Sequence, residues 1–124
     1  LPGTLGGDLT VDQGYEAARR CMLSCLIVLK YALGDLDRVD YVLQMTGWVN
    51  SAPGFVDQPR VINGATDLLT ALYGQNGLAA RAAIGCQGLA MNSSVEIALV
   101  VAFSGDEVRE PLQTWAVQGQ VPGR

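Results

Sequence analysis

The sequence predicts an α+β fold in which two helices cover one face of a small sheet. Apolar residues recur at spacings of three and four in two segments, between Thr10 and Gly34 and between Asp57 and Gly74, and this is the period of amphipathic helices. Three other segments alternate in hydrophobicity with the period of strands. The order is helix, strand, helix, strand, strand, which favours helices gathered on one side of a sheet.

Local signals mark the ends of both predicted helices. Thr10, followed three residues later by Gln13, forms a capping-box pattern, and Gly34 is a natural C-terminal stop. The second helix is expected to begin after Asp57 as N-cap, with Pro59 in its first turn, where a missing N–H is tolerated. These signals predict a long first helix and a shorter second one.

The strands are expected at residues 38–50, 79–86 and 93–103. The short 88–92 segment predicts that the last two strands form a hairpin. On the first strand, the set expected to face the helices is Val39, Tyr41, Leu43, Met45 and Val49. The other face carries Asp40, Val42, Gln44, Thr46 and Trp48, a mixture of side chains that predicts partial burial against another subunit.

Length and composition indicate a single domain with a real core. The chain has 124 residues, of which 49% are apolar. Residues 1–104 are expected to form this domain, and residues 105–124 a polar tail in which Trp115 is a candidate anchor for a partner. No apolar run is long enough to span a membrane.

Charge and rare residues exclude several classes of function. The net charge is −4 and the basic residues are scattered, which argues against nucleic-acid binding. The absence of His excludes imidazole catalysis and imidazole metal ligands. Cys21, Cys25 and Cys86 form no CxxC pattern, which predicts free buried thiols. We therefore expect no metal, no cofactor, and a location in the cytoplasm or in the reducing matrix of an organelle.

Three polar side chains stand out in apolar surroundings. Arg81 lies in the small-residue run 78–89, and its planar guanidinium is suited to bind a ligand carboxylate with two parallel hydrogen bonds. The alternative is a salt bridge from Arg81 to Glu96, which a hairpin would bring close. Glu96 is the only carboxylate inside an apolar strand and is a candidate for proton transfer. Asn63, between apolar positions of the second helix, is a candidate hydrogen-bonding group for a ligand.

Four stretches carry a family pattern, and they are Asp8–Arg19, Thr46–Ala65, Ala80–Gly85 and Val95–Ile97. Together and in this order they resemble the Rid/YjgF family, also called endoribonuclease L-PSP, and most of all its YjgF-like subgroup. The resemblance implies a chorismate-mutase-like fold and a homotrimer with clefts between its subunits. Well-known members hydrolyse reactive enamines and imines, such as 2-aminoacrylate, to a keto acid and ammonia.

The resemblance also assigns roles to residues. Arg81 aligns with the family arginine that holds the substrate carboxylate, and Asn63 with a cleft asparagine. Ala83 stands where many members have Cys. The family strand reads Glu-Ile-Glu, and its second Glu is linked to activation of the attacking water; here that position is Ala98. The sequence shows no counterpart of the family's N-terminal strands, and the polar tail lies outside the family pattern.

The leading expectation is a homotrimer that binds a small carboxylate between subunits, through Arg81, Asn63 and Ala83. Arg81 and Glu96 are its catalytic candidates for hydrolysis of an enamine or imine. The alternative is a non-catalytic member that serves as a structural or ligand-sensing subunit of a larger complex, with the tail docking a partner. Ribonuclease activity follows only from the family label, and an acidic chain without His argues against it.

Overall fold

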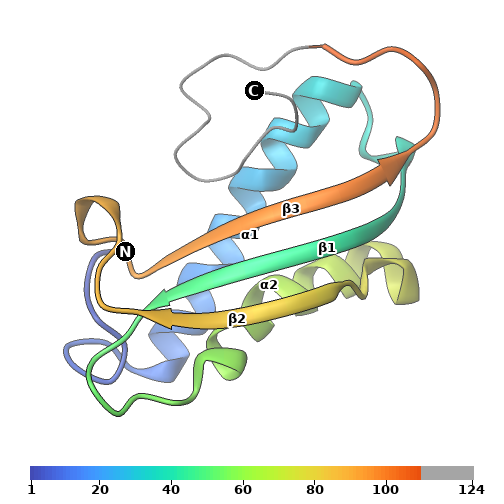
Figure 1. The fold of residues 1–124 in the computed structure, drawn as a ribbon. Coiled ribbons are helices and arrows are strands. Elements are labelled where there is room, and N and C mark those ends of the chain that lie inside the picture. The colour runs from blue at the N-terminus through green and yellow to red at the C-terminus, as the bar shows by residue number, and fades with distance from the viewer. Residues whose placement is uncertain (110–124) are drawn as a thin grey trace.

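The computed structural model describes residues 1–109, and its elements follow the predicted order. They are α1 (Val11–Leu33), β1 (Val39–Asn50), α2 (Gln58–Tyr73), β2 (Ala80–Cys86) and β3 (Val95–Phe103). Figure 1 shows both helices on the same side of the sheet, which confirms the predicted α+β fold with helices on one face. Within this part of the chain, neither helix combines the length and the apolar character that crossing a membrane requires.

The ends of α1 follow from its capping residues. The backbone N–H of Gln13 donates to the Thr10 hydroxyl at 3.2 Å, and the backbone N–H of Thr10 donates to the Gln13 side chain at 2.9 Å. This reciprocal pair satisfies two donors that the first helical turn leaves free. At the other end, Gly34 has a φ of 83° and donates its N–H to Lys30 at 2.8 Å. Both predicted boundaries of α1 are confirmed.

The start of α2 is held differently from the start of α1. Asp57 precedes the helix as predicted, but its side chain makes no capping hydrogen bond. It forms a surface ion pair with Arg60 at 3.6 Å instead. Pro59 lies in the first turn and Gly74 follows the last residue, as predicted.

The core lies between the helices and the sheet. Its largest fully buried side chains come from every one of these layers, among them Met22 of α1, Met45 of β1, Ile62 of α2 and Ile97 of β3. Burial of each such side chain contributes about 1.5–3 kcal/mol relative to leaving it in water. This apolar layer fixes α2 over β1 and β2, and so determines which strand positions lie beneath α2.

The two helices approach closely at Gly64. A Cβ atom at this position would overlap the backbone carbonyl oxygen of Tyr15 in α1. Next to this contact, the Tyr15 hydroxyl donates to the Asp67 carboxylate at 2.6 Å. That hydrogen bond raises the pKa of Tyr15, because it favours the protonated phenol beside a negative charge. The absence of a side chain at Gly64 is thus what lets α1 and α2 meet.

The strand order is β2-β1-β3, so the predicted hairpin between the last two strands is wrong. β1 is central, pairs in parallel with β2 through the α2 crossover, and pairs antiparallel with β3. Residues 87–94 carry the chain from one sheet edge to the other, past the end of β1. Two strand spacings amount to about 10 Å, which an eight-residue link spans easily. A hairpin would instead have placed β2 and β3 side by side, with β1 at an edge of the sheet.

The first half of β1 departs from simple alternation. Its pairing with β3 shifts register between Val39 and Tyr41 and again between Val42 and Gln44. Val42 is therefore 4% exposed, whereas Tyr41 and Leu43 are 47% and 46% exposed. The predicted facing of these three residues was wrong, because each irregularity reverses the phase of the side chains that follow it. Beyond the second shift the prediction holds, and Met45 and Val49 face the core.

The sheet face that points away from the helices is uncovered within residues 1–109, and Figure 1 shows no element in front of it. Three rows of paired residues run across its three strands: Ile84–Trp48–Glu96, Ala82–Thr46–Ala98 and Ala80–Gln44–Val100. Large apolar side chains such as Ile84 and Val100 are exposed there. An apolar sheet face of this kind is typical of a surface that another protein surface covers.

The chain beyond β3 returns to the end of α1. The Arg109 backbone N–H donates to Ala32 at 2.8 Å, and the Arg109 guanidinium lies 5.0 Å from the centre of the Tyr31 ring. Tyr31 belongs to an exposed apolar stripe of α1, with Leu23 and Ile27 at spacings of four. Of the predicted tail, residues 110–124 lie outside the described residues, and so does the proposed anchor Trp115.

Candidate functional site: an arginine between an edge strand and a helix

Arg81 lies on β2, an edge strand, and its side chain is directed toward α2. It pairs with Met45, a fully buried residue of the helix-facing side of β1. One terminal nitrogen, Nη1, donates to the Thr66 hydroxyl at 2.8 Å, and the other, Nη2, donates to the Pro59 carbonyl at 3.2 Å. Both acceptors belong to α2, and the guanidinium is therefore held between the sheet and this helix.

The charge of Arg81 is not neutralised by the described part of the chain. Within residues 1–109, Arg60 and Asp57 form the only ion pair closer than 4.0 Å. The two groups that hold Arg81 are neutral, and the residue is partly exposed. A guanidinium has five N–H donors, so several remain after these two hydrogen bonds. Arg81 therefore offers a fixed, uncompensated cation to an anionic ligand.

Asn63 and Ala83 lie on the two elements that position this arginine, α2 and β2. Asn63 is on α2 between Pro59 and Thr66, and residues 59, 63 and 66 share one helix face. Ala83 follows Arg81 on the same side of β2, pairs with Gly47, and packs against the core. The fold thus brings three of the four predicted site residues to the region between α2 and β2.

Glu96 does not belong to this group, and the alternative of an Arg81–Glu96 salt bridge is wrong. Glu96 lies on β3, at the opposite edge of the sheet, where it pairs with Trp48 on the uncovered face. Arg81 lies on the helix-facing side. The two residues are thus separated by β1, or about 10 Å, and by the thickness of the sheet. The predicted salt bridge required β2 and β3 to be neighbours in a hairpin. Because β1 lies between them, neither the hairpin nor the salt bridge forms.

This placement limits how one chain could use an acid on β3. Ala98, the position of the missing family Glu, pairs with Thr46 and shares the uncovered face with Glu96. A small molecule bound to Arg81 on the helix-facing side cannot also touch residue 96 or 98 of the same chain. If Arg81 and an acid at position 96 or 98 act together on one ligand, they must therefore come from two different chains.

The sequence did not reveal the residues that hold Arg81. Thr66 and the Pro59 carbonyl are seven residues apart, or about two helical turns, so they lie on the same side of α2. A parallel β1-α2-β2 crossover places that side over β2. A crossover predicted in place of the hairpin would have put α2 over β2, and this is the one signal that could have indicated a contact between Thr66 and Arg81.

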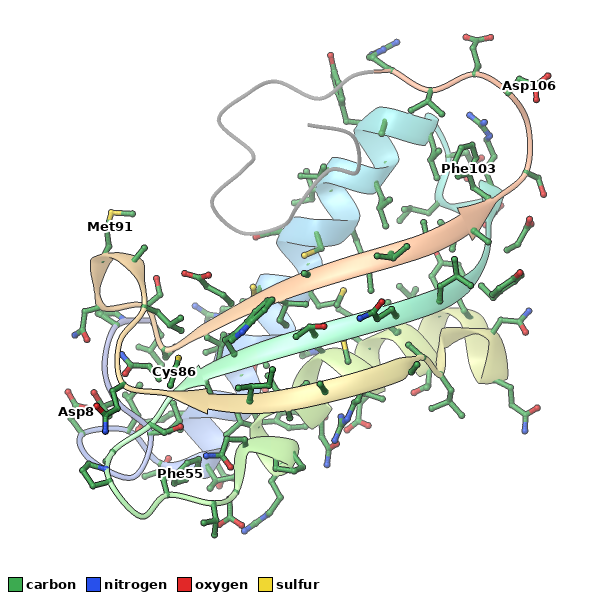
Figure 2. The ribbon with its side chains drawn as sticks, viewed as in Figure 1. Asp8, Phe55, Cys86, Met91, Phe103 and Asp106 are labelled. Carbon is green, nitrogen blue, oxygen red and sulfur yellow. The ribbon has the colours of Figure 1, made fainter. Side chains whose placement is uncertain are left out.

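A second cluster of reactive groups is found on α1. Cys21 and Cys25 are one turn apart, and a hydrogen bond from the Cys25 thiol lowers the pKa of Cys21. The same hydrogen bond, together with burial, raises the pKa of Cys25. Within residues 1–109, no third cysteine, carboxylate or histidine joins them in a group that could hold a metal ion. Cys86 is the last residue of β2, and Figure 2 shows it at the same end of the molecule as Asp8 and Phe55.

The fold places the protein in the class of small α+β domains with two helices over a mixed sheet of order β2-β1-β3. A family model described as "YjgF/chorismate mutase-like, putative endoribonuclease" matches residues 1–104. The chain therefore belongs to the YjgF/chorismate-mutase-like family, as its sequence pattern indicated.

Individual relatives agree with this assignment. Protein TCP17 from Trypanosoma cruzi is 42% identical over 105 residues, which is 84% of this chain and 66% of that protein. The crystal structure of Atu1372 from Agrobacterium tumefaciens, a protein of unknown function, is 40% identical with a TM-score of 0.83, over 85% of this chain and 68% of that one. A structure from Shewanella oneidensis, described as a "putative endoribonuclease", is 31% identical with a TM-score of 0.74, over 77% and 64%. The chain spans about two thirds of the length of these relatives.

Proposed function

We propose that the protein binds a small carboxylate at Arg81, and that its ligands are enamines or imines of amino acids and the keto acids they yield. The observation that supports this most directly is a guanidinium fixed by two neutral acceptors and left without a carboxylate partner within residues 1–109. A planar guanidinium matches a carboxylate through two parallel hydrogen bonds. Asn63 and Ala83 would line the same site, and no metal or cofactor is part of the proposal.

The binding site is proposed to be completed by a second chain in a homotrimer. Two features support this: the uncovered apolar sheet face, and the location of Arg81 and residues 96–98 on opposite faces of one sheet. In such a trimer, the ligand of one chain's arginine would meet the uncovered face of its neighbour. Exclusion of water from that boundary would strengthen every hydrogen bond to the ligand.

A charge on the uncovered face is expected to dissociate the assembly. Ile84→Asp replaces a side chain that is 42% exposed beside Trp48, and burying its carboxylate between chains would cost several kcal/mol. Light scattering should report three chains for the parent and one for the variant. Leu72→Asp, an exposed apolar position on α2, should stay trimeric. An Ile84→Asp protein of unchanged mass would contradict an interface on this face.

The proposed reaction is hydrolysis of a 2-aminoacrylate-type substrate. The enamine tautomerises to the imine, water adds to the imine carbon, and cleavage of the carbon–nitrogen bond releases ammonia and leaves the keto acid. Arg81 would hold the carboxylate so that the adjacent imine carbon is presented to water. The second Glu of the family strand is Ala98 here, so we propose that turnover is slow.

Ala98→Glu is expected to raise turnover. The new carboxylate would lie on the uncovered face, beside the ligand held by a neighbouring chain's Arg81, where it could accept a proton from the attacking water. Unlike a carboxylate at Ile84, it would be placed close to that guanidinium, whose positive charge offsets the cost of its burial. We expect kcat/KM for 2-aminoacrylate, generated in the assay, to rise by at least about tenfold, since a positioned base contributes about 10²–10⁴. Ala98→Gln, which matches the new side chain in size but carries no charge, serves as the control. Equal rates in the parent and the Ala98→Glu variant would contradict this site arrangement.

The alternative is a non-catalytic subunit of a larger assembly. It is favoured by the exposed apolar stripe of Leu23, Ile27 and Tyr31 on α1, which the proposed trimer leaves outside. A native mass well above three chains, together with no acceleration of 2-aminoacrylate hydrolysis, would support it. A trimer with turnover would exclude it. The ribonuclease reading, which the family description and the Shewanella relative suggest, finds little support in an acidic chain without His.

A further inference from the structure

The position of Arg81 on an edge strand does not by itself require its anchoring by α2. An arginine on an edge strand could remain in water, where its long side chain has many rotamers. Here both terminal nitrogens are tied to one helix, by the Thr66 hydroxyl at 2.8 Å and the Pro59 carbonyl at 3.2 Å. The side chain is ordered by contacts that a purely surface arginine would not make.

The two acceptors that hold Arg81 are neutral groups and not carboxylates. A carboxylate in either place would hold the guanidinium more strongly, but it would also neutralise the charge and compete with an anionic ligand. A hydroxyl and a carbonyl fix the orientation and leave the charge in place. Each accepts one N–H here, which leaves further N–H groups of the same fork for a ligand.

We propose that Thr66 is a positioning residue, whose hydroxyl holds the Arg81 guanidinium in the orientation that accepts a ligand carboxylate. The inference rests on the proposed function, because it concerns the same arginine. The ordering of Arg81 takes place when the protein folds, so the ligand meets a prearranged fork and less freedom is lost on binding. Pro59 contributes through its backbone oxygen, which a side-chain substitution leaves in place, and Thr66 is therefore the residue to test.

Two substitutions at this position separate the hydroxyl from the shape of the side chain. Thr66→Val keeps the branched shape and removes the acceptor, whereas Thr66→Ser keeps the acceptor. With 2-oxobutanoate as the probe in isothermal titration calorimetry, we expect Thr66→Val to raise Kd by about tenfold, the size of one hydrogen bond to a charged group. Thr66→Ser should remain within about threefold of the parent. If the valine crowds the site and the protein unfolds, Thr66→Ala takes its place.

A matched control is available one turn further along α2. The hydroxyl of Thr70 donates to the Asp67 carbonyl at 3.1 Å and has no contact with Arg81 among the hydrogen bonds of residues 1–109. Thr70→Val therefore removes a helix hydroxyl of the same kind and should leave Kd unchanged. Urea unfolding of every variant shows whether a change in Kd merely follows a loss of stability.

A double-mutant cycle decides between positioning and a general structural role. If Thr66 acts through Arg81, Thr66→Val should have no further effect on the residual binding of an Arg81→Ala protein. The proposal for Thr66 would be overturned if Thr66→Val weakened binding equally in the parent and in the Arg81→Ala protein, or if Thr66→Val left binding unchanged. If Thr66→Val left binding unchanged but Arg81→Ala lost it, the proposed function would remain intact. Unchanged binding in Arg81→Ala would instead refute the proposed function itself.

Discussion

Arg81→Ala is expected to bind 2-oxobutanoate at least about 100-fold more weakly than the parent protein. Two charge-assisted hydrogen bonds between a guanidinium and a carboxylate contribute about 1.5–3 kcal/mol each, and both are lost with the side chain. Hydrolysis of 2-aminoacrylate should fall at the same time, because the substrate carboxylate is no longer held. Arg81→Lys should recover part of the affinity, since an ammonium group keeps the charge but not the planar fork.

Arg60→Ala is the control for this prediction. Arg60 lies on the first turn of α2, is 65% exposed, and pairs with Asp57 on the surface. Its removal takes away one positive charge next to Pro59, which holds Arg81, and so tests for a long-range electrostatic effect on binding. We expect Arg60→Ala to bind 2-oxobutanoate with an unchanged Kd. If Arg81→Ala also bound it with the affinity of the parent, the carboxylate site would be refuted.

Gly64→Ala is expected to reduce the free energy of unfolding by more than about 3 kcal/mol, or to prevent folding. The new methyl group would overlap the Tyr15 carbonyl oxygen and also lie near the Arg19 backbone nitrogen, and backbone atoms cannot move aside as a flexible side chain can. The helices would have to separate, and the core beneath them would lose contact. Urea unfolding followed by circular dichroism measures the effect.

Gly88→Ala provides the comparison. A Cβ at Gly88 would meet no atom within 4 Å, and this glycine is not among those with positive φ. The same chemical change should therefore alter stability by less than about 1 kcal/mol. Equal unfolding midpoints for Gly64→Ala and the parent would contradict the close crossing of α1 and α2.

The elements could be predicted from the sequence because their signals are local. The capping box at Thr10 and Gln13 and the stop at Gly34 lie within a few residues of the boundaries they determine. Strand order could not be predicted in the same way. Whether β2 pairs with β3 or with β1 depends on which strand gains the central, most buried position, and that choice involves residues far apart in the sequence.

The irregularities of β1 show a related limit. Alternation correctly placed Met45 and Val49 but failed at Val42, because two register shifts occur before Gln44. Neither Gly nor Pro marks these shifts in the sequence. They are set by the pairing with β3 and by the apolar layer that Val42 joins.

The candidate site was predictable in part. Arg81 and Asn63 were conspicuous as polar side chains among apolar positions, and the family pattern gave both a ligand-binding role. Glu96 was equally conspicuous, but its expected partner was wrong because the hairpin was wrong. Thr66 carried no signal, since a threonine within a helix is ordinary until the strand beneath it is known. A contact such as the one between Thr66 and Arg81 joins two elements across a crossover, and local sequence patterns do not predict it.

Arg81 is proposed to hold a carboxylate at a boundary between two chains. A crystal structure of the protein grown with 2-oxobutanoate tests this most directly. We expect the ligand carboxylate within hydrogen-bond distance of the Arg81 terminal nitrogens, with the uncovered sheet face of a second chain lining the other side. A ligand bound away from Arg81, or enclosed by one chain alone, would contradict it.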